Sequence, residues 1–250
     1  MNKIAFITGA TSGIGLATAQ AFANNNIDLI ICGRNEKKLQ ELQQELSQKV
    51  KVTALCFDVS NNAQVVASIN SLSDDWKQIE ILVNCAGNAH GLSSIQDGDI
   101  NDWDLMIDIN VKGLLYVSRA IMPFMIERHK GHVVNISSVA GKQTYQNGAV
   151  YCASKKAVEA ISEGMRLDLT QHGIRITNIA PGAVQTNFSL VRFKGDAERA
   201  NKVYEGFEPI KPTDVADAIV YAVNAPAHVT IADIVMYAAA QSAPTTIYRN

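Results

Sequence analysis

Short apolar runs recur along the whole chain, and longer amphipathic stretches separate most of them. The amphipathic stretches, such as 35–48 and 150–172, have the periodicity of helices. Continuous apolar strands that alternate with helices are typical of a parallel sheet covered on both faces. Because crossover connections are right-handed, this order predicts a doubly wound α/β fold with about seven strands. The predicted strands are residues 4–8, 27–33, 50–57, 81–85, 132–137, 174–180 and 234–237.

The chain has 250 residues, which suits one α/β unit with a sizeable core. No linker, repeat or low-complexity tract divides it, so a single domain over residues 1–250 is expected. One polar, irregular segment at 186–208 follows the sixth strand. Loops at the carboxyl ends of strands line the ligand crevice in such sheets, so this segment is predicted to be a substrate lid.

Charge and apolar content exclude several classes of protein. The net charge is −2 and no block of like charges occurs, which disfavours nucleic-acid binding. No apolar run approaches about 18 residues, so no membrane span is expected. The start of the chain lacks the pattern of a secretory signal. None of the four cysteines forms a CxxC pair, which favours reduced thiols and a cytoplasmic protein; they are Cys32, Cys56, Cys85 and Cys152.

A glycine-rich turn at residues 8–15, Thr-Gly-Ala-Thr-Ser-Gly-Ile-Gly, links the first strand to the first helix. Glycines let a backbone approach a pyrophosphate closely, and the start of a helix offers free N–H groups to an anion. A tight turn with no ligand would look similar. The position between the first strand and a long helix favours a dinucleotide site on a Rossmann fold.

The end of the second strand bears on which dinucleotide binds. NAD sites place an acid about 20 residues past the glycine loop, whereas an arginine there suits a 2′-phosphate. Arg34 stands at that point with no acid beside it, which predicts NADP. Asp58, after the third strand, is a candidate acceptor for the adenine amino group. A solvated arginine and an ordinary turn former are the alternatives for these two residues.

Tyr151 and Lys155 lie four residues apart on a predicted helix, so their side chains share one face. Such a pair is common by chance. It gains weight from two polar strand ends, Asn-Ile-Ser-Ser at 135–138 and Asn-Cys-Ala-Gly at 84–87.

With these motifs, nearly the whole chain resembles the short-chain dehydrogenase/reductase family. Asn110, Ser138 and a Pro-Gly pair at 181–182 complete the family pattern, and Cys85 departs from it where the family usually has a second Asn. The resemblance implies an oxidoreductase with NADP as cofactor. The predicted cofactor-binding residues are Gly9, Thr11, Ser12, Gly13, Ile14, Gly15, Arg34, Asp58, Val59, Asn84, Ala86, Gly87, Tyr151, Lys155, Pro181, Gly182, Val184 and Thr186.

The residue types suggest how the centre works. A phenol with its ordinary pKa of about 10 is a poor base, but Lys155 and an oxidised nicotinamide would favour its ionised form. Tyr151 could then exchange a proton with an alcohol while hydride moves to or from the cofactor. Ser138 would hydrogen-bond to the substrate oxygen. By resemblance, Asn110 would hold a water between Lys155 and solvent. A strand-end cap and a helix cap are the structural alternatives for Ser138 and Asn110.

Further stretches, including Asp-Trp at 102–103 and Val-Arg-Phe-Lys-Gly-Asp at 191–196, resemble the NADP-dependent 3-hydroxy acid dehydrogenases (serine or allo-threonine dehydrogenases) of this family. A 3-hydroxy acid brings a carboxylate into a dry crevice, where it needs a cationic or multiply hydrogen-bonded partner. Arg192 is the first candidate because a guanidinium can form two parallel bonds, although it could instead pair with Asp196. Lys142 is the second candidate, and His90 is a candidate pocket residue.

The histidines show no spacing typical of metal ligands, so no metal is expected. The family implies dimers or tetramers, and small residues at helical spacing fit a helix contact between subunits or close packing on the sheet; they are Ala153, Ala157, Ala160 and Gly164. Two other functions are compatible with this fold. A reductase of a keto-sugar or cyclic ketone shares the same centre. A non-catalytic NADP-binding regulator would be expected to lose the Tyr-Lys pair.

Overall fold

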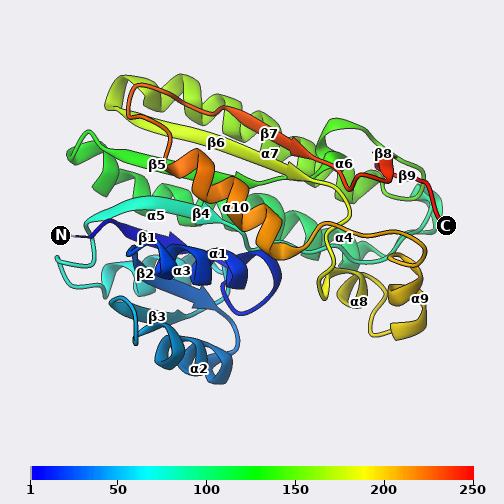
Figure 1. Cartoon of the computed structure of the whole chain (residues 1–250), viewed down its shortest axis with the longest axis horizontal. Helices are drawn as coiled ribbons and strands as arrows, with labels where there is room; N and C mark the ends of the chain where they lie inside the picture. Colours follow the sequence, from blue (N-terminus) through cyan, green and yellow to red (C-terminus); the bar gives the residue numbers. More distant parts are fainter. Residues whose placement is uncertain (1) are drawn as a thin grey trace.

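The computed structural model describes residues 2–250 and contains one large parallel sheet (Figure 1). Its strands are β1 (Ile4–Ile7), β2 (Asp28–Gly33), β3 (Val52–Cys56), β4 (Ile79–Asn84), β5 (Gly131–Ile136), β6 (Ile174–Pro181) and β7 (Asp233–Met236). Their order in the sheet is β3-β2-β1-β4-β5-β6-β7, and every pair is parallel. The winding reverses between β1 and β4, which is where ligands bind in such sheets. The predicted doubly wound fold with about seven strands is confirmed.

Helices cover both faces of the sheet. The helices are α1 (Gly13–Asn24), α2 (Glu36–Leu46), α3 (Asn62–Asn70), α4 (Ile100–Ile107), α5 (Leu114–Glu127), α6 (Val139–Lys142), α7 (Ala149–Leu169), α8 (Phe188–Arg192), α9 (Ala197–Lys202) and α10 (Pro212–Val223). Two 3₁₀ turns, η1 (Ile95–Asp97) and η3 (Thr170–His172), a π-helical turn, η2 (Asp108–Gly113), and a small hairpin of β8 (Gln241–Ala243) and β9 (Thr246–Ile247) complete the fold.

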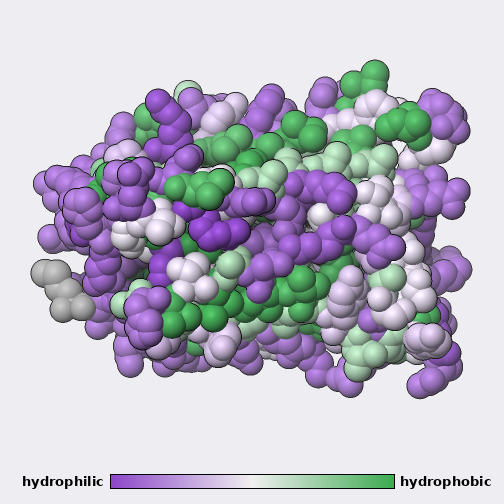
Figure 2. Space-filling view, turned by 90° about the horizontal axis from the view of Figure 1, so that it is seen from above, coloured by the Kyte–Doolittle hydropathy of each residue, from purple (hydrophilic) through white to green (hydrophobic). Residues whose placement is uncertain are grey.

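The alternation of strand side chains builds two cores. Ala5 and Ile7 of β1 point into a core with α1, α2 and α10, whereas Phe6 between them points into a second core with α3, α5 and α7. All three are fully buried. Apolar residues also reach the surface in bands between hydrophilic ones, as the face in Figure 2 shows. Because Ala5 and Ile7 face one core and Phe6 faces the other, the sheet is apolar on both sides. This explains the continuous apolar runs in the sequence.

Element boundaries differ from the sequence-based ones by one or two residues, as at β4, which begins at Ile79. The larger difference concerns residues 186–208, the predicted lid. It is not wholly irregular, because it contains the short helices α8 and α9. Asp196 caps α9 by accepting a hydrogen bond from the backbone N of Arg199 at 3.0 Å. A helix of only six residues has too few turns to show a clear apolar period.

Helix α4, the π-helical turn and α5 run into one another, so the segment Ile100–Glu127 is a continuous helix of 28 residues. By its length, and by the composition of an 18-residue window within it whose mean hydropathy is 1.2, it could cross a membrane. Core helices of water-soluble proteins meet the same criteria. Here Val117, Ile121 and Met125 are fully buried against the sheet and neighbouring helices. The expectation that the chain has no membrane span stays a prediction.

A buried histidine on β5 makes the stability of this fold depend on pH. The side chain of His132 is 2% exposed, and its Nε2 lies 2.8 Å from Oγ1 of Thr177. Burial, reinforced by Arg175 and Lys3, lowers the pKa of His132 to about 3. The folded chain therefore keeps this ring neutral at pH values where an unfolded chain, with a histidine pKa of about 6.5, binds a proton.

We expect His132→Gln to reduce the amount by which the free energy of unfolding falls as the pH is lowered. Between pH 6.5 and 3, only the unfolded state of the native chain takes up this proton, so folding stability falls by about 1.4 kcal/mol per pH unit from His132 alone. Glutamine can keep a hydrogen bond to Thr177 but does not titrate. Urea unfolding at pH 7 and pH 5 measures the difference. Equal pH slopes in the two proteins would contradict the argument.

Candidate active site

The glycine-rich turn after β1 has the backbone of an anion cradle. Gly9 and Gly13 have φ of +67° and +53°, in the left-handed region that favours glycine. A Cβ at Gly15 would overlap the carbonyl oxygen of Gly9. Ser12, the N-cap residue of α1, makes no side-chain hydrogen bond to the first turn. The first N–H groups of α1 are therefore free to bind a pyrophosphate.

Arg34 and Asp58 lie side by side at the ends of β2 and β3. Arg34 Nη1 is 3.6 Å from Asp58 Oδ2, and the arginine side chain is 68% exposed. Burial alone would raise the pKa of Asp58, but hydrogen bonds from Ser60 and the charge of Arg34 bring that pKa below its usual value. An exposed guanidinium beside an ionised carboxylate can turn toward a 2′-phosphate. The contact of Asp58 with adenine stays a prediction.

The segment after β4 serves the site through its backbone more than through Asn84. The Asn84 amide is buried and donates to Ser118 Oγ and Asn135 Oδ1, both at 2.9 Å, so this side chain joins β4 to α5 and β5. Thr8 Oγ1 accepts from the backbone N of Cys85 and of Ala86, each at 2.9 Å. The end of β1 and the loop after β4 are thereby held together.

Asn110 lies in the π-helical turn, a feature often found at functional sites. Its Oδ1 accepts from the backbone N of Asn88 at 2.8 Å, and its Nδ2 donates to Asn88 O and Ser154 Oγ at 2.9 and 3.0 Å. Both donors are used, which leaves one lone pair on Oδ1 for a water. A Cβ at Gly87 would lie 3.2 Å from Asn110 Oδ1 and 3.4 Å from Lys155 Nζ, so glycine leaves room for both.

Tyr151, Lys155 and Ser138 meet where β5, β6 and α7 come together. Lys155 Nζ donates to the carbonyl of Ile136 at 3.0 Å, and burial lowers the pKa of Lys155 to about 8. Ser138 Oγ donates to Pro181 O at 3.3 Å. Burial, with a smaller contribution from Tyr145, holds the pKa of Tyr151 above its usual value, although Arg192 and a hydrogen bond with Ser138 offset part of this rise. These side chains are placed to exchange a proton with a bound substrate, and the charge of Arg192 lies beside them.

Arg192, on helix α8 of the predicted lid segment, lies against the ring of Tyr151. Its guanidinium carbon lies 4.9 Å from the centre of the Tyr151 ring and 5.4 Å from that of Phe188, and its Nη2 donates to the Tyr145 hydroxyl at 2.6 Å. The alternative pairing with Asp196 is not formed, because that carboxylate caps α9. The lid also approaches the glycine loop, since a Cβ at Gly13 would lie 3.2 Å from Cγ2 of Thr186.

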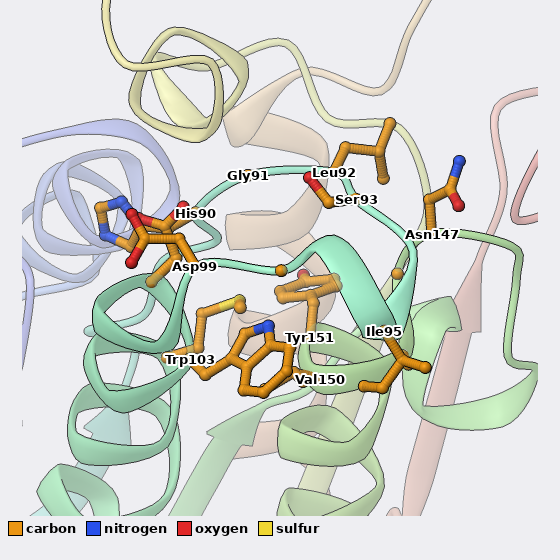
Figure 3. Close-up of a pocket in the computed structure, with 15 residues that line it drawn as sticks. His90, Gly91, Leu92, Ser93, Ile95, Asp99, Trp103, Asn147, Val150 and Tyr151 are labelled. Atoms are coloured by element: carbon orange, nitrogen blue, oxygen red, sulfur yellow. The ribbon is translucent and has the colours of Figure 1, made fainter.

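The structure brings His90 to the pocket but not Lys142. Figure 3 shows His90, Trp103 and Tyr151 around a pocket bounded by residues 90–99, α4 and the start of α7. Lys142 forms ion pairs with Glu159 at 2.5 Å and Asp233 at 2.7 Å, and these three line a different cavity between α7 and β7. The second candidate for a carboxylate partner is therefore wrongly placed: two acids from distant parts of the chain draw it away.

Sequence reasoning missed several residues that shape the site. Tyr145 holds Arg192, and Phe188 packs on Tyr151 with ring centres 5.6 Å apart. Gln241 Oε1 accepts from the backbone N of Ala183 at 2.9 Å, and a Cβ at Gly182 would overlap this oxygen. Glutamine thus fixes the loop after β6, where the predicted residues Pro181, Val184 and Thr186 lie. None of these partners is near its target in the sequence, so no local spacing could reveal them.

Across the part of the chain that the structure describes, no group of three His, Cys, Asp or Glu side chains could hold a metal ion. The donor set of the site instead consists of backbone N–H groups, hydroxyls and cations. Such a set suits an anionic dinucleotide and a small oxygenated substrate.

Comparisons with known proteins agree with this geometry. The family model described as short chain dehydrogenase matches residues 3–196. An NADP-dependent 3-hydroxy acid dehydrogenase of Salmonella typhi is 42% identical over 240 residues, 96% of each chain. Sulfoacetaldehyde reductase 2 of Chromohalobacter salexigens is 42% identical over 232 residues, 92% of each chain. The solved structure of a closed form of serine dehydrogenase complexed with NADP+ is 40% identical to this chain and has a TM-score of 0.93. The match covers 99% of this chain and 100% of that one. The chain belongs to the short chain dehydrogenase family.

Proposed function

We propose that this protein is an NADP-dependent oxidoreductase that transfers a hydride between the cofactor and a small 3-hydroxy acid or its 3-oxo form. Serine, allo-threonine and 3-hydroxypropionate are the expected types of substrate. The relatives named for NADP-dependent 3-hydroxy acid oxidation and for serine dehydrogenase support this function over nearly the full chain. Arg34 supports NADP because it stands where NAD sites place an acid.

The residues divide the work as follows. Tyr151 takes the proton of the alcohol during oxidation and returns it during reduction. Ser138 donates a hydrogen bond to the substrate oxygen as charge develops on it. Lys155 holds positive charge near the phenol, and Asn110 fixes the loop after β4 and can hold a water. NADP supplies the hydride chemistry when bound, with the glycine loop and residues 84–87 placed to receive it.

The position of Arg192 is the observation that most supports a carboxylate-bearing substrate. A carboxylate in a dry crevice needs a cationic partner. Arg192 brings one to within 4.9 Å of the Tyr151 ring, and its buried Nε has no hydrogen-bond partner. A free donor on a guanidinium beside the reacting group fits the carboxylate of a 3-hydroxy acid.

Arg192→Ala should raise the KM for 3-hydroxypropionate on the order of 10- to 100-fold, the value of a lost charge-assisted hydrogen bond. The KM for its neutral methyl ester should change far less. Steady-state kinetics with NADP measure both. Arg199→Ala is the matched control, because Arg199 belongs to the same segment but stacks on Phe193, at 4.3 Å, and not on Tyr151. If the native enzyme ignores 3-hydroxy acids and turns over neutral ketones, the substrate assignment is wrong.

One relative suggests a second substrate with the same chemistry. Sulfoacetaldehyde carries an anionic sulfonate beside its carbonyl, and the reductase named for it is 42% identical to this chain. Arg192 would bind a sulfonate as it binds a carboxylate. Sulfoacetaldehyde therefore belongs in the substrate panel, together with a keto-sugar and a cyclic ketone as neutral competitors.

We further infer a single domain over residues 1–250 with its lid at 186–208, a cytoplasmic location, and a homo-oligomer, either dimer or tetramer. No nucleic-acid or membrane partner is proposed. Support for the oligomer comes from α7, where Ala153 and Ala160 are exposed and a Cβ at Gly164 would meet no atom within 4 Å. Leu167 on the same helix is 78% exposed. Such a helix face suits contact with a second subunit.

A further inference from the structure

The charged and titratable groups around Tyr151 are few. Tyr145 and Arg192 face its ring from the loop before α7 and from α8, and Cys152 is its neighbour on α7. One turn further along α7, Lys155 donates to the carbonyl of Ile136. Across the pocket lie His90 and Asp102, and Asp102 is paired with Lys194 at 3.0 Å. The cation that contacts the Tyr151 ring is therefore Arg192.

Several contacts hold Arg192 in this position. Its backbone O accepts from the N of Gly91 at 2.9 Å, which ties α8 to the loop that lines the pocket. Its Nη2 donates to the hydroxyl of Tyr145, and the rings of Tyr145, Phe188 and Tyr151 surround the guanidinium at 4.9 to 5.9 Å. A cation among aromatic rings is drawn to the negative faces of the rings and to any anion that forms beside it.

We propose that Arg192 is a positioning residue for the proton transfer, because it brings lid charge onto the Tyr151 ring and stabilises the phenolate. This inference rests on the proposed acid–base role of Tyr151, and it goes beyond the binding of a substrate carboxylate. In oxidation, the alcohol proton moves to the Tyr151 oxygen, the hydride leaves the same carbon for NADP+, and a carbonyl forms. Reduction reverses each transfer. Arg192 neither gains nor loses a proton in either direction.

Lid position and proton transfer are thereby linked. Arg192 and Lys194 both belong to the lid, and Lys194 pairs with Asp99 at 3.3 Å as well as with Asp102. With these contacts formed, the guanidinium lies on the Tyr151 ring. If the lid moved away, Tyr151 would lose this cation and stay protonated over a wider pH range.

The test is the pH profile of kcat for oxidation of methyl 3-hydroxypropionate by NADP. This ester has no carboxylate, so loss of carboxylate binding cannot move the profile. Arg192→Met should shift the rise of kcat toward alkaline pH by about one unit, as expected when an opposite charge near a titrating group is removed. Arg192→Lys keeps a positive charge, so its pH profile should lie close to that of the native enzyme.

Arg199→Met is the matched control, since it removes a stacked arginine from the same lid at 4.3 Å from the Phe193 ring. Its profile should match that of the native enzyme. Titration of NADPH fluorescence checks that each variant still binds cofactor. An unmoved profile in Arg192→Met would overturn the inference, as would an equal shift in Arg199→Met. Retention of turnover by Tyr151→Phe would instead overturn the proposed function.

Discussion

Tyr151→Phe should lower kcat on the order of a thousandfold, within the range that a positioned acid or base contributes. The substitution removes one hydroxyl and keeps the ring that packs on Phe188 and Arg192. NADPH binding should therefore stay close to native. Initial rates of 3-hydroxypropionate oxidation, with fluorescence titration of NADPH, measure the two quantities separately.

A matched control for this substitution is Tyr221→Phe. Tyr221 is 66% exposed on α10, away from the site, so loss of its hydroxyl should leave kcat at the native value. If Tyr151→Phe kept a tenth or more of the native kcat, the acid–base role assigned to Tyr151 would be wrong. Loss of NADPH binding together with turnover would point to a damaged site instead.

Arg34→Asp should reverse the choice of cofactor. It removes a guanidinium from the position of the 2′-phosphate and adds an acid beside Asp58, so kcat/KM with NADP should fall by on the order of 1.5–3 kcal/mol, or about 10- to 100-fold. Activity with NAD should rise because an acid there can accept from the ribose hydroxyls. Comparison of kcat/KM for the two cofactors measures the change.

Lys37→Gln controls for the loss of a positive charge nearby. Lys37 is 86% exposed and paired only loosely, at 4.0 Å, with Glu41 in the next turn of α2. This variant should keep the native preference for NADP. Equal kcat/KM for NADP and NAD in the native protein would remove the assigned role of Arg34.

The fold could be predicted from the sequence because the inner strands of the sheet, such as β1 and β2, are buried on both sides. Residues 29–32, Leu-Ile-Ile-Cys, are apolar without a gap, and the structure places β2 in the interior of the sheet between β1 and β3. The glycine turn and the Tyr151–Lys155 pair were also accessible, since each is a local spacing on one element. The short helices α8 and α9 could not be predicted in this way, although Asp196 stands where a helix cap would be expected.

The rest of the site depends on pairs that are distant in sequence. Lys142 follows Ser138 by one helical turn, yet its ammonium forms ion pairs with Glu159 and with Asp233, which is 91 residues away in the sequence. Arg192 meets the Tyr145 hydroxyl across 47 residues. Spacing along one element cannot show such partners, because only the packing of elements decides which side chains meet.

Because of the π-helical turn at Asp108–Gly113, the number of residues in this helix determines which side chains face the pocket and which face the sheet. Each residue of an α-helix rotates the next by about 100°. Loss of one residue in this turn would let regular α-helical hydrogen bonds run on to Glu127, but it would rotate the residues before the turn against those after it. Met106, which lines the pocket, and Ile121, which covers the sheet, could no longer both face inward. A change in the number of residues along this helix should therefore disturb the pocket more than a single substitution on its exposed face.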